Sequence, residues 1–239
     1  MRIEIKLLPL KEQAVLPFNY NYEVYFQLVE KVRTIEPDVA ELMSSSRDLW
    51  TFSRIIVRNR RVIPDRGIEI LSDDVSLYIS SSNEDIIRAI AEAVEKSPEI
   101  HVGNITFLVS KVRVLKMPKI GKENTFSTLS PIVVRTVKFD EGRLKHWDLY
   151  PHDELFIDKL RKTMLLRYTE INGHMPEDKD FKIETIRFKP TRLMVGGSYV
   201  RGSLMVFRYI GSREIAEFAY DNGFGEKTRF GFGMVKLIE

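Results

Sequence analysis

Residues 223–233 have the sequence GFGEKTRFGFG, in which Gly-Phe-Gly occurs twice around an insert that contains Lys227 and Arg229. The glycines are Gly223, Gly225, Gly231 and Gly233. Glycine tolerates positive φ and lets another backbone come close, so the stretch predicts a loop with an open surface of main-chain N–H groups. Beside a lysine and an arginine, such a surface suits a phosphate-bearing ligand.

The residues after this loop argue against a mononucleotide site. A nucleotide P-loop ends in Lys-Ser or Lys-Thr and opens a helix. Here the loop lacks that ending and leads into residues 234–238, which predict a strand. A flexible hairpin is the alternative interpretation of the glycines taken alone.

The paired glycine triplets before a C-terminal strand resemble the glycine-rich loop of the RAMP superfamily of CRISPR-associated proteins. A second stretch, STLSPIVV at residues 127–134, is similar to the segment that opens the second domain of its repeat-RNA endoribonucleases, the Cas-six family of archaeal type. The order of predicted elements fits the same family along the whole chain. This resemblance implies two tandem ferredoxin-like domains and an RNA-binding surface at the loop.

Composition narrows the class of protein. The chain has 239 residues, 44% of them hydrophobic and 30% charged, which is typical of a folded protein with one or two domains. Without cysteine it has neither disulfides nor thiolate metal sites. No run approaches the roughly 20 apolar residues of a membrane helix, so a cytoplasmic protein without membrane contact is expected. With a net charge of +3, nucleic-acid binding requires local clusters of Lys and Arg.

The first half of the chain predicts one β-α-β-β-α-β unit. Its helices are residues 22–35, with Asn21 as N-cap, a short helix from Pro37, and a helix capped by Ser82 or Asn83. Strands are predicted at residues 2–8, 51–63, 68–80 and 105–114. This order is that of a ferredoxin-like domain, which we place at residues 1–119.

The second half predicts the same order after a polar linker at residues 116–124. Helices are expected at residues 153–168 and from Ser212 to about residue 222. Strands are expected at residues 130–139, 181–195, 199–210 and 234–238, with a hairpin turn at Gly196-Gly197. The fold class is therefore α+β, with a second ferredoxin-like domain at residues 120–239 that carries the loop 223–233.

Two groups of basic residues are candidates for binding RNA phosphates in addition to Lys227 and Arg229. Strand alternation places Arg54, Arg58 and Arg60 on one face of the strand at residues 51–63. Arg187, Lys189 and Arg192 lie on the strand at residues 181–195. Arginines along a strand form a plausible phosphate track, and the alternative is an ordinary solvated sheet face.

The resemblance also implies a metal-independent RNA cleavage, in which the ribose 2′-hydroxyl attacks the adjacent phosphate and leaves a cyclic phosphate. Archaeal members use a tyrosine, a histidine and a lysine, and these positions fall on Val29, Ser44 and Asp48 here. Valine cannot transfer a proton, and an aspartate repels the charge that develops on the phosphate. Tyr25 and Arg47 are the candidate substitutes. No metal or other cofactor is expected, because the four histidines lack ligand spacing.

We therefore expect a protein that binds single-stranded or weakly structured CRISPR repeat RNA and has lost most or all cleavage activity. Two alternatives stay open. One is an active endoribonuclease that uses Tyr25 or Arg47. The other is a structural subunit of a CRISPR effector complex, in contact with other CRISPR-associated proteins. A homodimer is also open.

Overall fold

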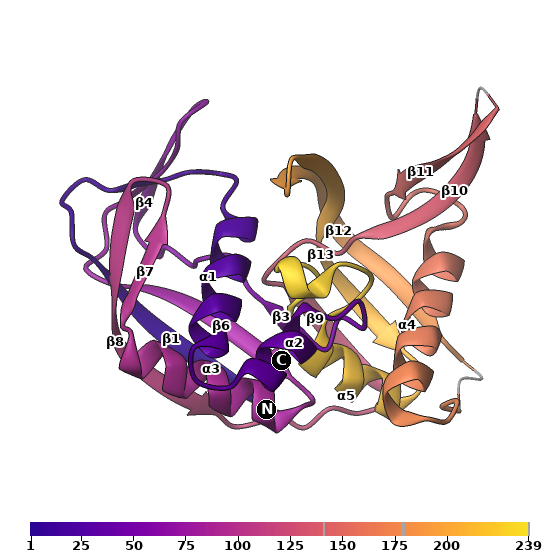
Figure 1. Cartoon of the computed structure of the whole chain (residues 1–239). Helices are drawn as coiled ribbons and strands as arrows, with labels where there is room; N and C mark the ends of the chain where they lie inside the picture. The colour runs from indigo at the N-terminus through magenta and orange to yellow at the C-terminus, as the bar shows by residue number, and fades with distance from the viewer. Residues whose placement is uncertain (141, 178–179, 239) are drawn as a thin grey trace.

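Strand β1 (Arg2–Pro9) lies at the centre of the first of two main sheets (Figure 1). The computed structural model describes residues 1–140, 142–177 and 180–238. Four further strands complete this antiparallel sheet in the order β3-β6-β1-β8-β7: β3 (Trp50–Phe52), β6 (Val75–Ser81), β7 (Glu99–Val102) and β8 (Ile105–Leu115). Ile3, Ile5 and Leu7 alternate along β1 and are fully buried, as the period-2 pattern predicts.

Three helices pack against this sheet: α1 (Asn21–Arg33), α2 (Pro37–Ser44) and α3 (Glu84–Lys96). The predicted cap of α3 is confirmed, since the Asn83 side chain accepts a hydrogen bond from the Asp85 amide at 2.9 Å. The predicted cap of α1 is wrong. Tyr20 occupies the N-cap, and Asn21 begins the helix with its amide group directed at the glycine-rich loop.

The stretch at residues 51–63 differs from the single strand that alternation predicts. Only β3 joins the main sheet, and the chain then continues irregularly to β4 (Arg60–Ile63). The Ile55 amide donates to the Tyr20 hydroxyl at 2.8 Å, which replaces a ladder hydrogen bond. A small sheet in the order β2-β5-β4 results, formed with β2 (Val15–Leu16) and β5 (Gly67–Ile70). The strand predicted at residues 68–80 is correspondingly split into β5 and β6.

The second main sheet has the order β12-β13-β9-β14 and is also antiparallel. Its strands are β9 (Glu123–Thr128), β12 (Lys182–Val195), β13 (Ser198–Ile210) and β14 (Val235–Ile238). Helices α4 (Phe156–Asn172) and α5 (Arg213–Asn222) cover it. The β12–β13 hairpin turns at Gly196-Gly197, both with positive φ, as predicted.

The opening strand of this domain is β9, and not the predicted strand at residues 130–139. Instead, β10 (Val134–Asp140) pairs with β11 (Arg143–Leu149) in a separate hairpin that projects from the domain (Figure 1). Strand β11 was not predicted, and β9 lies partly in the predicted linker. Polar residues alternate along β9, so composition alone suggested a linker at its start.

Each main sheet has the strand order of a ferredoxin-like unit and its own hydrophobic core, which confirms the tandem α+β fold. The boundary between residues 119 and 120 stays a prediction, and the last residue of the predicted second domain, Glu239, lies outside the described residues. Arg2 joins the two domains: its guanidinium donates to Val235 O at 2.8 Å and lies 3.7 Å from the centre of the Tyr220 ring. None of the described helices is long and apolar enough to span a membrane.

Candidate RNA-binding site

The glycine-rich loop, residues 223–233, connects α5 to β14 and passes between the two domains (Figure 1). It contains the short helix η1 (Thr228–Phe230). The four glycines have φ between 75° and 82°, where other residues are strained. A Cβ at Gly225 would collide with the carbonyl oxygen of Val133, and one at Gly231 with the Phe52 ring. Only glycine therefore allows this loop to pack against both domains.

The main-chain amides of the loop do not form the predicted open surface. All four glycines are buried. Their N–H groups have partners inside the protein: Ala219 O for Gly223, the Met164 sulfur for Gly225, Thr228 O for Gly231 and Pro131 O for Gly233. The expectation of an exposed N–H cradle is wrong, because these amides hold the loop in place. What the loop offers to a ligand is its side chains, and its contact with RNA stays a prediction.

Arg167 on α4 supports the loop from the protein interior and is not among the residues predicted for the site. Its side chain is buried and donates hydrogen bonds to the following acceptors: the carbonyl oxygens of Asn222, Gly223, Gly225 and Asp48, and the Thr228 hydroxyl. Burial lowers the pKa of Arg167 to about 10, so the guanidinium is still charged at neutral pH. A signal existed, because Arg167 follows Leu160 and Met164 on the apolar stripe of α4.

Asp48, where the resemblance implies a lysine, is bound to the loop on the other side. One carboxylate oxygen accepts from the Lys227 amide at 2.9 Å, and the other accepts from the Arg229 guanidinium at 3.1 Å. Asp48 is buried and has a φ of 51°, a backbone conformation that aspartate tolerates better than most residues. Its carboxylate therefore forms an ion pair with Arg229 and fixes the loop.

The other two positions at which the resemblance implies catalytic groups hold Val29 and Ser44. Val29 is 3% exposed in the core of the first domain. The Ser44 hydroxyl donates to Ala40 O at 2.8 Å within α2. Valine has no group that transfers a proton, and a serine hydroxyl is a poor acid or base at neutral pH.

The two candidate substitutes lie beside the cleft and not in its lining. The Tyr25 ring packs against Phe230 at 4.6 Å and Trp50 at 6.1 Å between centroids, as a half-buried aromatic of the domain interface. Arg47 is exposed, and its guanidinium lies 3.7 Å from the Glu170 carboxylate. An exposed ion pair of this kind contributes little free energy, so Arg47 is free to move.

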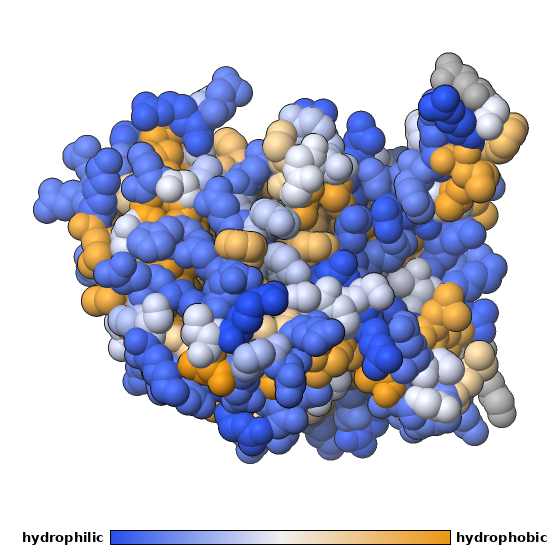
Figure 2. Space-filling model, viewed as in Figure 1, coloured by the Kyte–Doolittle hydropathy of each residue, from blue (hydrophilic) through white to orange (hydrophobic). Residues whose placement is uncertain are grey.

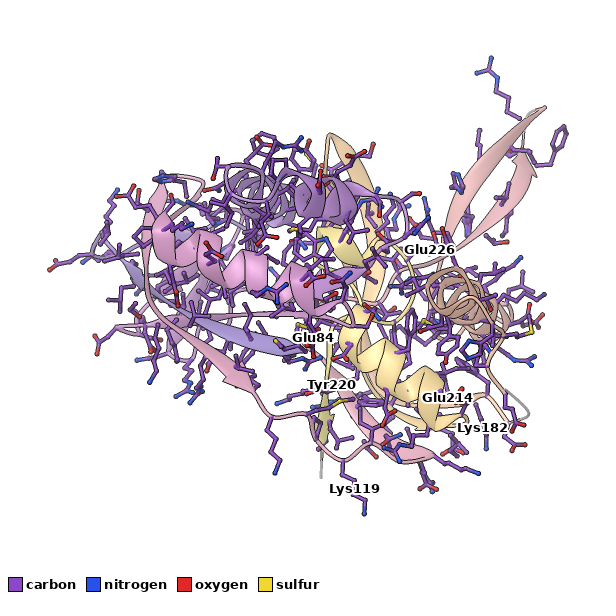
Figure 3. All side chains as sticks on the ribbon, turned by 60° about the horizontal axis from the view of Figure 1, so that its bottom comes forward. Glu84, Lys119, Lys182, Glu214, Tyr220 and Glu226 are labelled. Atoms are coloured by element: carbon purple, nitrogen blue, oxygen red, sulfur yellow. The ribbon has the colours of Figure 1, made fainter. Side chains whose placement is uncertain are left out.

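A cleft of about 380 Å³ opens where the loop, α4 and the base of the β10–β11 hairpin meet. Its lining consists of Ser46, Asp48, Arg135, Thr163, Leu166, Arg167, Glu170, Glu226, Lys227, Arg229 and Phe230. Figure 3 shows Glu226 between α4 and the hairpin base. The Arg135 guanidinium pairs with Glu226 at 2.7 Å. We call this the basic cleft.

Lys227 is a half-buried cation in the lining of the basic cleft. Among residues 1–140, 142–177 and 180–238, its ammonium group forms no ion pair with a carboxylate. Burial lowers the pKa of Lys227, and the nearby positive charge of Arg135 lowers it further. A phosphate would relieve that repulsion and supply the missing counter-charge.

The two predicted arginine tracks lie outside the basic cleft. Arg54, Arg58 and Arg60 do not share a strand face, because the strand is broken; Arg54 is half-buried, and the Arg60 guanidinium donates to Val57 O at 2.8 Å. Arg187, Lys189 and Arg192 are exposed along β12, as alternation and polarity predict. The Arg192 guanidinium lies 4.4 Å from the centre of the Tyr199 ring.

The histidines are dispersed. His101 is on β7, His146 is on β11, His152 packs near Phe188, and His174 follows α4. Within the described part of the chain, no three His, Asp or Glu side chains are grouped closely enough to hold a metal ion.

Comparison with protein families agrees with this geometry. Residues 115–237 match the family described as CRISPR associated protein Cas6, C-terminal, and residues 15–113 match CRISPR-associated protein Cas6, N-terminal. The chain belongs to the Cas6 family. The two matches correspond to the two ferredoxin-like units of the structure.

Relatives in the Cas6 family match along the full length. The chain is 71% identical to the CRISPR-associated endoribonuclease-like protein Cas6nc of Pyrococcus horikoshii, with 100% of both chains covered. It is 33% identical to a CRISPR-associated endoribonuclease Cas6 of Methanocaldococcus jannaschii, with 100% of this chain and 93% of the relative covered. A solved structure described as an RAMP protein binding different RNA substrates matches with a TM-score of 0.97 and 71% identity over 100% of both chains.

Proposed function

We propose that this Cas6-family protein binds single-stranded or weakly structured CRISPR repeat RNA at the basic cleft and does not cleave it efficiently. The observation that carries this proposal is that the Asp48 carboxylate is hydrogen-bonded to the glycine-rich loop. A carboxylate bound to Lys227 and Arg229 occupies the position where the family's catalytic cation is expected. The loop cations Lys227 and Arg229 line the cleft, so the site keeps its attraction for phosphate without the family's groups that move protons.

The names of the relatives support the proposed separation of RNA binding, which is kept, from RNA cleavage, which is reduced. The relatives at 71% and 66% identity, from Pyrococcus horikoshii and Pyrococcus furiosus, are described as endoribonuclease-like. The relative at 33% identity is described as an endoribonuclease. RNA binding is in the description of the solved structure with 71% identity. Loss of a general acid or base typically lowers the rate about 100- to 10,000-fold and leaves phosphate contacts in place.

Replacing Lys227 and Arg229 together by alanine is expected to weaken the binding of repeat RNA and its dependence on salt. For every phosphate that the variant no longer binds, the slope of log affinity against log salt should fall by about 0.7. The measurement is filter binding of labelled repeat RNA over a salt series. Lys236→Ala, an exposed lysine on β14, is the matched control and should bind like the parent chain. An unchanged affinity and slope in the double variant would disprove the proposed site.

Repeat RNA incubated with excess protein in EDTA is expected to remain intact on a denaturing gel while it shifts on a native gel. Tyr25→Phe should leave this result unchanged, because the Tyr25 ring packs against Phe230 and Trp50 outside the cleft lining. Tyr25→Phe removes only the hydroxyl and keeps the ring. A discrete product ending in a cyclic phosphate, abolished by Tyr25→Phe, would show instead that Tyr25 substitutes for the missing residues.

A further inference from the structure

A row of aromatic side chains lies beside the basic cleft. Phe26 and Tyr22 come from α1, and Phe230 comes from η1 of the glycine-rich loop. The ring centres of Tyr22 and Phe26 are 6.4 Å apart, and those of Tyr22 and Phe230 are 6.3 Å apart. The ring planes in these two pairs are inclined by only 21° and 27°. We call these three residues the aromatic row.

The fold itself does not require the two rings of this row that come from α1. Helix α1 buries a different face, formed by Val24, Leu28, Val29 and Val32. Phe26 is 51% exposed and Tyr22 is 44% exposed. They are spaced by one helical turn, so they point in the same direction away from the core. Figure 2 shows apolar residues over α1 and η1 at the centre of a largely hydrophilic face.

The aromatic row is bordered by the second domain. The Met194 amide at the end of β12 donates to the Asn19 side chain at 2.9 Å. A methyl group on Gly196, in the β12–β13 turn, would lie 3.8 Å from the Tyr22 ring. Tyr22 and Gly196 line a surface depression together with Glu23. The Tyr22 end of this contact therefore lies at a depression that residues of both domains line.

Cations of the basic cleft lie next to Phe230, at one end of the aromatic row. The Arg229 guanidinium lies 4.7 Å from the centre of the Phe230 ring, and Lys227 is two residues before Arg229. The acidic neighbour Glu23 is engaged, because its carboxylate accepts from the Gly103 amide at 2.7 Å. Exposed rings leading into cations are the arrangement that single-stranded nucleic acids use, with bases on the rings and phosphates on the cations.

We propose that Tyr22 and Phe26 are base-stacking residues that hold unpaired nucleotides of the RNA next to the phosphate bound in the basic cleft. This inference rests on the proposed function. Because every base has a π-face, such contacts position the strand without selecting its sequence. The two rings would thereby set which backbone phosphate lies at Lys227. An anionic single strand fits this surface better than a protein helix, because the apolar row ends in cations.

Tyr22→Ala and Phe26→Ala are each expected to weaken the binding of single-stranded oligouridine about 5- to 100-fold. The slope of log affinity against log salt should not change, because both variants keep all the cations that bind phosphate. Tyr22→Phe keeps the ring and should bind normally. Phe139→Ala, an aromatic that is 74% exposed on the β10–β11 hairpin, is the matched control and should also bind normally.

A fluorescent adenine analogue in the oligonucleotide gives a readout that a merely structural role would not move. Stacking should quench it on binding, and Tyr22→Ala with Phe26→Ala should remove the quenching even at saturating protein. Unchanged affinity and quenching in these variants, while Lys227→Ala weakens binding, would overturn the stacking inference alone. Absence of RNA binding in the parent chain would instead overturn the proposed function. A peptide that competes with RNA only when Tyr22 and Phe26 are present would also overturn the inference.

Discussion

Replacement of Arg167 by methionine is expected to lower the free energy of unfolding by about 3–5 kcal/mol. Methionine retains much of the volume of the side chain but donates no hydrogen bond. The substitution leaves buried acceptors without partners in the glycine-rich loop and at Asp48. Unsatisfied buried polar groups of this kind cost about 1–3 kcal/mol each, and partial relaxation keeps the sum below simple addition. The Lys227 side chain should lose its fixed position at the same time.

Chemical denaturation of the two chains measures this effect directly. Arg213→Met on α5 is the matched control, since its side chain is 64% exposed and pairs with Glu217 in the same helix. Such a pair is worth about 0.3–0.5 kcal/mol. If Arg167→Met and Arg213→Met shifted the free energy of unfolding equally, Arg167 would not be the support of the loop. Repeat-RNA affinity of the Arg167 variant should fall even at temperatures where the chain is still folded.

Gly233→Ala is expected to lower the free energy of unfolding by about 2–5 kcal/mol, the second-largest loss. A φ of 75° costs an alanine about 1–2 kcal/mol in backbone strain. In addition, the new methyl group would clash with the carbonyl oxygen of Phe224 and lie 2.8 Å from its nitrogen. These are backbone atoms, which cannot rotate away, and crowding in a packed interior costs about 1–3 kcal/mol more.

Gly173→Ala separates the two contributions. Gly173 follows α4 with the same φ of 75°, but nothing lies within 4 Å of the position that a Cβ would take. It should therefore show the backbone cost alone. Thermal or chemical unfolding of both variants gives the difference, which we expect to be at least about 1 kcal/mol. Equal losses would mean that the loop moves aside and that close packing at Gly233 has no special role.

The sequence was most informative where local pattern and global fold agree. Alternation identified β1, β8 and the β12–β13 hairpin, and the apolar stripe with Asn83 identified α3. It was least informative where hydrogen bonds come from distant residues. The break after β3 depends on the Tyr20 hydroxyl, and the pairing of β9 with β14 joins residues that are far apart in the chain. Periodicity contains no information about such partners.

For the candidate site, too, local features were visible in the sequence and contacts between distant residues were not. The loop, its two cations and the departure at Val29, Ser44 and Asp48 were visible in the sequence. The bond between Asp48 and Lys227, across 179 positions, was not, and neither was the pairing of Arg135 with Glu226 across 91. The sequence indicated correctly that the four glycines have an unusual backbone conformation, but their role in the structure differs from the predicted one. They permit close packing, whereas the pattern alone suggested an open cradle of amides.

The packing of the loop against the first domain also bears on synthesis. Asn21 and Thr51 hold the loop through the carbonyl oxygens of Gly231 and Phe232, which are synthesised after the whole first domain. The first domain can fold during translation with that face uncovered, since domains generally fold as units. A chain released before residue 223 would lack the cleft, both loop cations and Phe230. Only molecules that contain the loop could then compete for RNA.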